Sequence, residues 1–210
     1  MSSLLLLCFV IYNYILCNLS QILLTSPKKC DNISSQLITV DTKRRGIMKT
    51  FFVVPHGAKF SGADPSMTPE GREQIRALKP HLPEDISEVW RGEGKRHGEV
   101  AEELGLKPTR YNALFGPASS VERRPDGAVT VLPDGSVYPF KPADAWIFRA
   151  SLLCLVEAEV KDRAAICSGR ECLMALTGKK AAEFKTGLYK ITIDGDKVIC
   201  EVIAFAPGDF

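Results

Sequence analysis

The fold of this chain is indicated first by one short stretch of sequence, Phe51-Phe52-Val53-Val54-Pro55-His56-Gly57. Four consecutive apolar residues, all aromatic or β-branched, are typical of a strand that is buried on both faces of a sheet. The Pro-His-Gly sequence that follows ends such a strand, because proline lacks a backbone N–H and glycine favours turns. We therefore predict a buried strand with His56 just beyond its carboxyl end.

The sequence on either side of this stretch alternates between strand and helix patterns. Thr68 is a suitable N-cap and Pro69 a suitable first residue for a helix that runs to about Leu78. A second helix is predicted from about Lys95 to Leu104, with Gly105 just past its end. Strands and helices that alternate in this way favour an α/β domain.

The remaining chain predicts further elements of both kinds. Two Pro-Asp-Gly turns flank an apolar run and indicate a hairpin excursion. We expect a layered α/β/α sandwich with a mostly parallel sheet. Because the chain ends in a hairpin, we expect antiparallel strands at one edge of this sheet. The further predicted elements are a strand at 86–90, the excursion around 128–132, a helix at 146–160, a strand at 164–167, a helix from 171 to 176, and strands at 187–193 and 197–205.

Residues 1–47 differ in kind from residues 48–210, since they contain neither alanine nor glutamate. The apolar segment 4–24 is interrupted by polar residues, so it fits the ~20 apolar residues of a membrane span poorly. It also lacks the charges and small residues of a secretory signal. Positive residues after it would keep the body in the cytosol. We expect a cytoplasmic domain, free or anchored through residues 4–24. An alternative is that translation starts at Met48 and the leader (residues 1–47) is a misassigned start.

Composition narrows the possible classes of function. The chain has 210 residues, of which 45% are hydrophobic and 25% charged, which suits one globular domain with a substantial core. A net charge of +2 and the lack of a basic, aromatic-rich stripe argue against a nucleic acid as partner. The seven cysteines lack the paired CxxC spacing of a zinc site, and in a cytosolic protein we predict buried thiols rather than disulfides.

Three blocks of sequence, in order, resemble the histidine phosphatase (phosphoglycerate mutase-like) superfamily. Val53–Gly57 and then Met67–Gln74 are similar to that family's strand ending in Arg-His-Gly and its Leu-Thr-x-x-Gly-x-x-Gln helix start. Trp90–Gly105 is similar to Ser-Ser-Pro-Leu-x-Arg-Ala-x-Gln-Thr-Ala-Glu-x-Leu-Gly. Ala164–Arg170 lies where the family has a strand ending in Ser-His-Gly. The segment between the second and third blocks is unmatched.

The resemblance implies a chemistry and candidate residues. In that family a histidine accepts a phosphoryl group, two arginines and a second histidine bind its oxygens, and an acid protonates the leaving group. His56 falls on the nucleophile and Arg96 on a phosphate-binding arginine. Arg170 is a candidate substitute cation, and Glu122 lies about where the acid would fall by distance alone. No metal or organic cofactor is implied.

Two departures from the family pattern put catalysis in doubt. Pro55 replaces the first arginine and Gly169 replaces the second histidine, so two oxyanion donors are lost. Each such loss costs roughly 100- to 1000-fold in rate when a single donor is deleted. The expected function is therefore a catalytically impaired member that binds a small phosphorylated or anionic ligand or a partner. The alternatives are a slow phosphomonoester hydrolase using His56, and a membrane-tethered interaction protein.

Each candidate residue also has a structural interpretation. His56 could be a hydrogen-bonded residue at a strand end, and Arg96 a solvated charge on a helix face. Arg170 could be an exposed arginine at a helix start. His81 and His97 are predicted to lie on the surface, and Arg91 and Glu93 to pair with each other or with solvent. Two cysteines beside the predicted site, Cys167 and Cys172, are expected to be core residues, because no histidine is placed to activate them.

Overall fold

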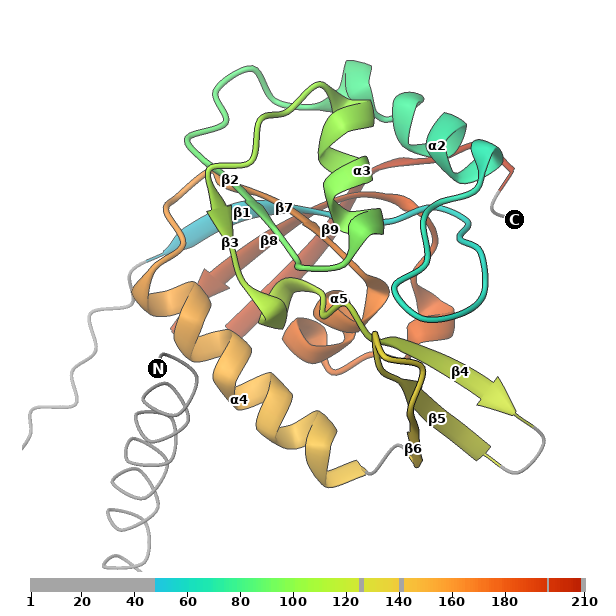
Figure 1. Cartoon of the computed structure of the whole chain (residues 1–210). Coiled ribbons are helices and arrows are strands. Elements are labelled where there is room, and N and C mark those ends of the chain that lie inside the picture. The colour runs from blue at the N-terminus through green and yellow to red at the C-terminus, as the bar shows by residue number, and fades with distance from the viewer. Residues whose placement is uncertain (1–47, 125–126, 140–141, 196, 209–210) are drawn as a thin grey trace, which may run out of the picture. The chain divides into compact units, whose positions relative to one another are not determined.

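The computed structural model describes residues 48–124, 127–139, 142–195 and 197–208, and these form a mixed sheet covered by helices (Figure 1). The strand order is β3-β2-β7-β1-β8-β9. The first four of these strands are parallel, and β8 and β9 are antiparallel to their neighbours. The strands are β1 (Lys49–Pro55), β2 (Val89–Arg91), β3 (Arg110–Tyr111), β7 (Ala165–Ser168), β8 (Gly187–Asp194) and β9 (Lys197–Phe205).

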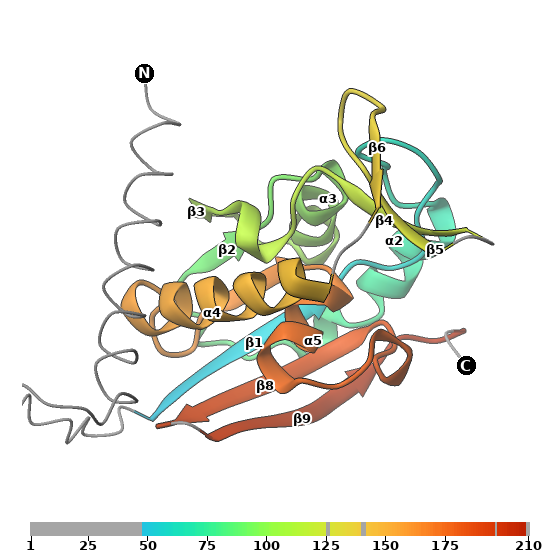
Figure 2. The same ribbon diagram turned by 90° about the horizontal axis from the view of Figure 1, so that it is seen from below.

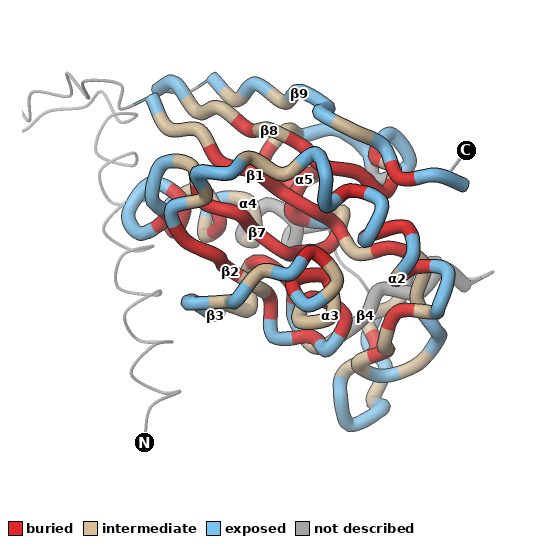
Figure 3. The backbone as a smooth tube through the Cα atoms, turned by 90° about the horizontal axis from the view of Figure 1, so that it is seen from above, coloured by how far each residue is buried: buried red, intermediate tan, exposed pale blue. Residues whose placement is uncertain are grey.

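Helices cover both faces of this sheet. Two of them, α2 (Pro69–Arg76) and α3 (Lys95–Leu104), lie over one face (Figure 3). The other two, α4 (Pro142–Ala158) and α5 (Arg170–Thr177), lie over the opposite face (Figure 2). The predicted α/β/α sandwich with a mostly parallel sheet is thereby confirmed. Three short 3-10 helices complete the helical elements: η1 (Lys79–His81), η2 (Ala113–Phe115) and η3 (Ala181–Glu183).

The alternation of side chains along β1 divides the core in two. Phe51 and Val53 pack with α4 and α5 in one cluster, whereas Phe52 and Val54 pack with α2 and α3 in the other. All four side chains are at most 3% exposed. Successive side chains of a strand point to opposite faces, so a continuous apolar run is what a strand between two helical layers requires.

The predicted excursion is a small antiparallel sheet rather than a single hairpin. Its strands are β4 (Ser120–Arg124), β5 (Gly127–Val131) and β6 (Val137–Pro139). Gly127, the last residue of the first Pro-Asp-Gly sequence, begins β5, and the second Pro-Asp-Gly sequence at 133–135 lies between β5 and β6 and reverses the chain there.

Two predicted boundaries shift. The strand expected at 86–90 is β2, which starts at Val89 because pairing with β7 begins where the Ala165 N–H donates to the Glu88 carbonyl oxygen (2.9 Å). Helix α4 starts at Pro142, before the expected residue 146, as proline suits a first helical position. Residues 1–47 lie outside the described residues, so their predicted role stays a prediction. Within the described part of the chain, no helix has the length and apolar character of a membrane span.

Candidate active site

The carboxyl ends of β1 and β7 bring the first and third sequence blocks together. Pro55 pairs with Ser168 in the parallel register of the two strands, and the His56 N–H donates to the Ser168 carbonyl oxygen at 2.9 Å. Gly169 follows directly. A Cβ atom placed on Gly169 would lie 3.8 Å from His56 Nε2. The strands predicted at 51–54 and 164–167 are therefore parallel neighbours, and they place His56 and Gly169 at one edge of the sheet.

The loop after His56 is held by the start of α2, which explains the first sequence block. The Ala58 N–H donates to Gln74 Oε1 (3.0 Å), and the Thr68 N–H donates to the Ala58 carbonyl oxygen (2.9 Å). Thr68 also caps α2 by accepting from the Gly71 N–H. A side chain on Gly71 would collide with the Ala58 backbone. The Thr-x-x-Gly-x-x-Gln pattern is therefore the surface on which the His56 loop rests.

His56 is in a state suited to nucleophilic attack. Its Nδ1 lies 2.8 Å from the Gly57 carbonyl oxygen, which can only accept a hydrogen bond. In the neutral ring Nδ1 therefore carries the proton, and Nε2 keeps its lone pair. Burial lowers the pKa of His56 to about 4, with the positive charge of Arg96 acting in the same direction. The ring is neutral at physiological pH.

Arg96, on the first turn of α3, is buried with part of its guanidinium unsatisfied. Its side chain is 5% exposed, and Nη2 donates to the carbonyl oxygens of Pro117 (3.2 Å) and Ser119 (2.9 Å). Nε and Nη1 have no hydrogen-bond partner, and Asp64 Oδ1 is 3.9 Å from Nη1. Burial lowers the pKa of Arg96, but an arginine stays cationic near neutral pH. The buried charge can bind an oxyanion.

Glu171 brings a negative charge to the same place. Its carboxylate contacts the position that a Cβ atom on Gly169 would occupy. The negative charge acts on both neighbours, because it raises the pKa of His56 and of Arg96 against the larger lowering by burial. The sequence prediction missed Glu171. Where the family has a histidine that binds phosphate, this chain has an open position beside a carboxylate.

The surface position predicted for His97 is wrong. His97 is 0% exposed, and its ring centroid lies 5.8 Å from that of His56. Gly92 and Gly116 make room for the ring, since a Cβ atom on Gly92 would come within 2.5 Å of His97 Nδ1. Neither ring nitrogen forms a hydrogen bond of acceptable geometry, although the Gly116 carbonyl favours the protonated form slightly. Burial lowers the pKa of His97 well below its usual value.

No described contact places Arg170 or Glu122, the other two predicted site residues, beside His56. Arg170 Nη2 lies 3.5 Å from Thr186 Oγ1, and Arg170 does not line the cavity that Arg96 borders. Glu122 lies in β4, where its backbone pairs with Val129, and its side chain is outside the described part of the structure. The phosphate-binding role of Arg170 and the acid role of Glu122 stay predictions.

The predictions for the cysteines, His81 and Arg91 are confirmed in part. Cys167 and Cys172 are buried, and burial raises the pKa of each thiol to about 12, so both are core residues as expected. The cysteines of the described residues are free thiols, but Cys154 is exposed rather than buried. His81 is exposed, as predicted. Instead of pairing with Glu93, the Arg91 guanidinium stacks 4.5 Å from the centre of the Tyr111 ring.

The arrangement can support limited chemistry. A neutral imidazole with a free Nε2, next to a buried guanidinium with free N–H groups, can hold an oxyanion and attack it. The described residues contain no group of three or more side chains suited to a metal ion. No signal in the sequence indicated the burial of His97, because Gly116, which makes room for its ring, comes close to Gly92 only in the folded chain.

Comparison with solved structures finds several whose fold is similar to that of this chain. The open reading frame Rv3214 product of Mycobacterium tuberculosis aligns at a TM-score of 0.54 and 12% identity, over 75% of this chain and 98% of that one. A proposed alpha-ribazole-5'-P phosphatase of Escherichia coli K-12 aligns at 0.54 and 13%, over 74% and 96%. The chain has the histidine phosphatase, or phosphoglycerate mutase-like, fold.

TTHB049 of Thermus thermophilus aligns with this chain at a TM-score of 0.51 and 17% identity, over 75% of this chain and 98% of that one. Comparisons with protein-family models and with curated protein sequences find no match. The structural similarity shows a shared fold, but at identities this low it does not show a shared function. Function depends on the residues that the fold brings together. The fold of this chain brings together His56, Arg96 and Glu171.

Proposed function

We propose that this chain is a catalytically impaired protein of the histidine phosphatase fold that binds a small phosphorylated or anionic ligand beside His56. The observation that carries the proposal is the guanidinium of Arg96, which is buried while Nε and Nη1 lack partners. Buried N–H groups without acceptors are costly, and the Asp64 carboxylate, 3.9 Å from Nη1, is too far to accept a hydrogen bond from it. An oxyanion bound at the carboxyl ends of β1 and β7 would supply the hydrogen-bond acceptors that Nε and Nη1 lack.

Impairment of catalysis is inferred from the groups that surround this ligand position. Pro55 offers neither a guanidinium nor an N–H, and Gly169 offers no side chain. The carboxylate of Glu171 adds a negative charge beside the phosphoryl group, whose oxygens carry negative charge that the site must stabilise during transfer. Electrostatic stabilisation of that charge is the largest contribution in most such enzymes. The site is therefore better suited to binding than to turnover.

One observation favours a second candidate function, a slow phosphomonoester hydrolase. The hydrogen bond from Nδ1 of His56 to the Gly57 carbonyl leaves Nε2 free and fixes the ring orientation. Such a ring could accept a phosphoryl group even where the stabilisation of the transition state is poor. The two candidates share the ligand position and differ only in rate.

Titration with inorganic phosphate tests the proposal. The chemical shifts of backbone amides near His56 should move with phosphate concentration, with weak affinity of about millimolar, or roughly −4 kcal/mol. Arg96→Gln should abolish these shifts. Lys95→Gln removes an exposed positive charge from the adjacent position of α3 and serves as the matched control. Shifts that persist in Arg96→Gln would place the anion elsewhere, and p-nitrophenyl phosphate hydrolysis that is lost in His56→Asn would favour the slow enzyme.

A further inference from the structure

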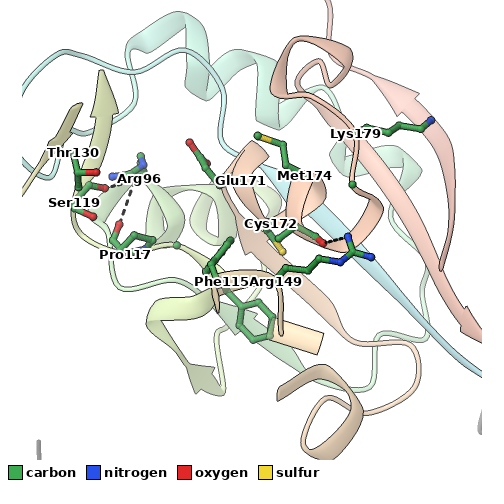
Figure 4. Close-up of a pocket in the computed structure, with 15 residues that line it drawn as sticks. Arg96, Phe115, Pro117, Ser119, Thr130, Arg149, Glu171, Cys172, Met174 and Lys179 are labelled. Atoms are coloured by element: carbon green, nitrogen blue, oxygen red, sulfur yellow. Dashed lines mark hydrogen bonds between the residues drawn. The ribbon is translucent and has the colours of Figure 1, made fainter. Parts of the chain in front are cut away.

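A cavity of about 400 Å³ adjoins the anion position (Figure 4). It is bordered by Arg96 at the start of α3, by the loop after η2, by β5, and by α4 and α5. Gly169 and Glu171 lie on its wall, and a Cβ atom on Gly169 would lie 3.8 Å from His56 Nε2, although His56 itself does not line the cavity. The volume is within the range of small-molecule sites, about 300–1,000 Å³.

Away from Arg96 and Glu171, the wall of the cavity is mostly apolar. Its aromatic, aliphatic and sulfur-containing side chains come from separate elements, which makes the cavity part of the fold rather than of one loop. A polar ligand such as a sugar would leave hydroxyl groups without partners against this wall, at a considerable cost. The apolar lining residues are Phe115, Pro117, Phe148, Cys172, Met174 and Ala175.

The positive charges that border the cavity are not equivalent. Arg149 Nη1 donates to the Ala175 carbonyl oxygen at 2.5 Å, so this guanidinium is engaged at the end of α5. Lys179 is exposed to solvent. Arg96 differs from both, because its side chain is only 5% exposed and its Nε and Nη1 have no hydrogen-bond partner. An anionic group in the cavity would therefore bind at the Arg96 end, next to His56.

We infer that the cavity holds the apolar body of an amphiphilic anion whose charged head binds Arg96. The ligand class is an oxyanion attached to an aromatic or alkyl group, such as an aryl phosphate, rather than a phosphorylated sugar. This inference rests on the proposed function, since it uses the same anion position, and it adds the chemistry of the attached group. Glu171 lies at the junction of head and body, where its carboxylate opposes the negative charge of the head.

Four probes separate the two parts of the inference: inorganic phosphate, 1-naphthyl phosphate, 1-naphthol and glucose 6-phosphate. Binding is measured by isothermal titration calorimetry on the full chain. We expect 1-naphthyl phosphate to bind at least about tenfold more tightly than inorganic phosphate, since burial of a fused aromatic group adds affinity. Glucose 6-phosphate should gain no such advantage. Arg96→Gln should reduce 1-naphthyl phosphate to the affinity of the uncharged 1-naphthol.

Met174→Trp narrows the cavity from the α5 side, and Thr130→Trp narrows it from β5. Either variant should bring the ratio of the phosphate and naphthyl phosphate dissociation constants towards one. Ala158→Trp, which enlarges an exposed residue of α4 outside the cavity, is the matched control and should keep the wild-type ratio. Using two filling variants from different elements keeps the test valid if one of them fails to fold.

The outcomes distinguish the inference from the function on which it rests. If inorganic phosphate binds through Arg96 but the naphthyl group adds no affinity, the cavity inference is overturned and the proposed function stands. Equal enhancement by glucose 6-phosphate would also overturn it. If none of the phosphates binds, the proposed function fails first. A naphthyl advantage that survives both filling variants would place the apolar body outside this cavity.

Discussion

The carboxylate of Glu171 lies in the space beside His56 that a side chain on Gly169 would enter. Because Gly169 has no side chain, the Glu171 carboxylate can occupy this space. A histidine at 169 would have to displace the end of the flexible Glu171 side chain. The electrostatics of the site depend on this pair as much as on the loss of arginine at Pro55.

Restoration of catalysis is expected to depend on Glu171. The wild type should hydrolyse p-nitrophenyl phosphate barely above background. Pro55→Arg with Gly169→His returns two oxyanion donors and should raise the rate. Adding Glu171→Gln should raise it further, because the displaced carboxylate no longer opposes the developing negative charge. Steady-state hydrolysis of p-nitrophenyl phosphate at neutral pH compares the rates of the wild type, the double variant and the triple variant.

Glu73→Gln, an exposed change on α2, is the matched control in the restored protein and should leave the rate unchanged. Two results would contradict this account of the site. One is fast hydrolysis by the wild type that disappears in His56→Asn. The other is a restored protein that gains nothing from Glu171→Gln.

Glu171→Gln alone should tighten binding of inorganic phosphate. Like charges held close together cost one to several kcal/mol, so we expect roughly a tenfold gain or more. Calorimetric titration provides the measurement. An unchanged dissociation constant would mean that the carboxylate turns to solvent when the anion binds.

Local sequence patterns sufficed for the scaffold. The run Phe51–Val54 predicted a buried strand because a strand between two helical layers must be apolar on both faces. The helix start at Thr68 and Pro69 followed from capping chemistry that operates within one turn. The meeting of His56 with Gly169 could be predicted because parallel strands place their carboxyl ends on one edge of a sheet.

The electrostatics of the site could not be predicted in this way. His97 lies on a helix whose charged neighbours suggest exposure, and its burial depends on Gly92 and Gly116, which are close only in the folded chain. Glu171 acts through the room left by its neighbour Gly169. Such features come from contacts between distant segments, and periodicity within one element carries no information about them.

Arg96→Met should remove anion binding with little change in stability. The variant loses two hydrogen bonds to the carbonyl oxygens of Pro117 and Ser119, but it also removes a buried charge with unpartnered nitrogens, and these effects roughly offset. We expect the free energy of unfolding to change by less than about 1 kcal/mol. Urea denaturation and phosphate titration of the same protein measure both properties.

Arg72→Met is the contrasting control. Arg72 bridges α2 and α3 by pairing with Glu99 at 2.7 Å and with Glu103 at 2.8 Å. Its loss should destabilise the chain, by about 1–2 kcal/mol for charged hydrogen bonds in a partly buried position, without affecting phosphate binding. If Arg96→Met proved the more destabilising of the two, Arg96 would be a structural residue.

The domain should fold without residues 1–47. The described core clusters are built from residues beginning at Phe51, so the contacts that stabilise the sheet are present in a chain that starts at Met48. Circular dichroism and thermal melting of residues 48–210 should match the full-length protein within a few degrees. An insoluble product, or a midpoint far below that of the full chain, would show that the leader contributes to the core.

The stability of the domain should fall as the pH is lowered from about 6.5 to about 4. Burial lowers the pKa of His56 to about 4, whereas an unfolded histidine titrates near 6.5. Between these values the unfolded chain binds a proton that the folded chain does not, so protonation favours unfolding. For His56 this difference in pKa corresponds to a loss of about 3 kcal/mol in the free energy of unfolding, and His97 acts in the same direction.

His56→Asn, whose side-chain amide can still donate to the Gly57 carbonyl, should make the urea midpoint less sensitive to pH. His81→Asn, an exposed change on η1, should keep the wild-type sensitivity. A His56→Asn protein as sensitive to pH as the wild type would show that the ring of His56 is not held neutral in the folded state.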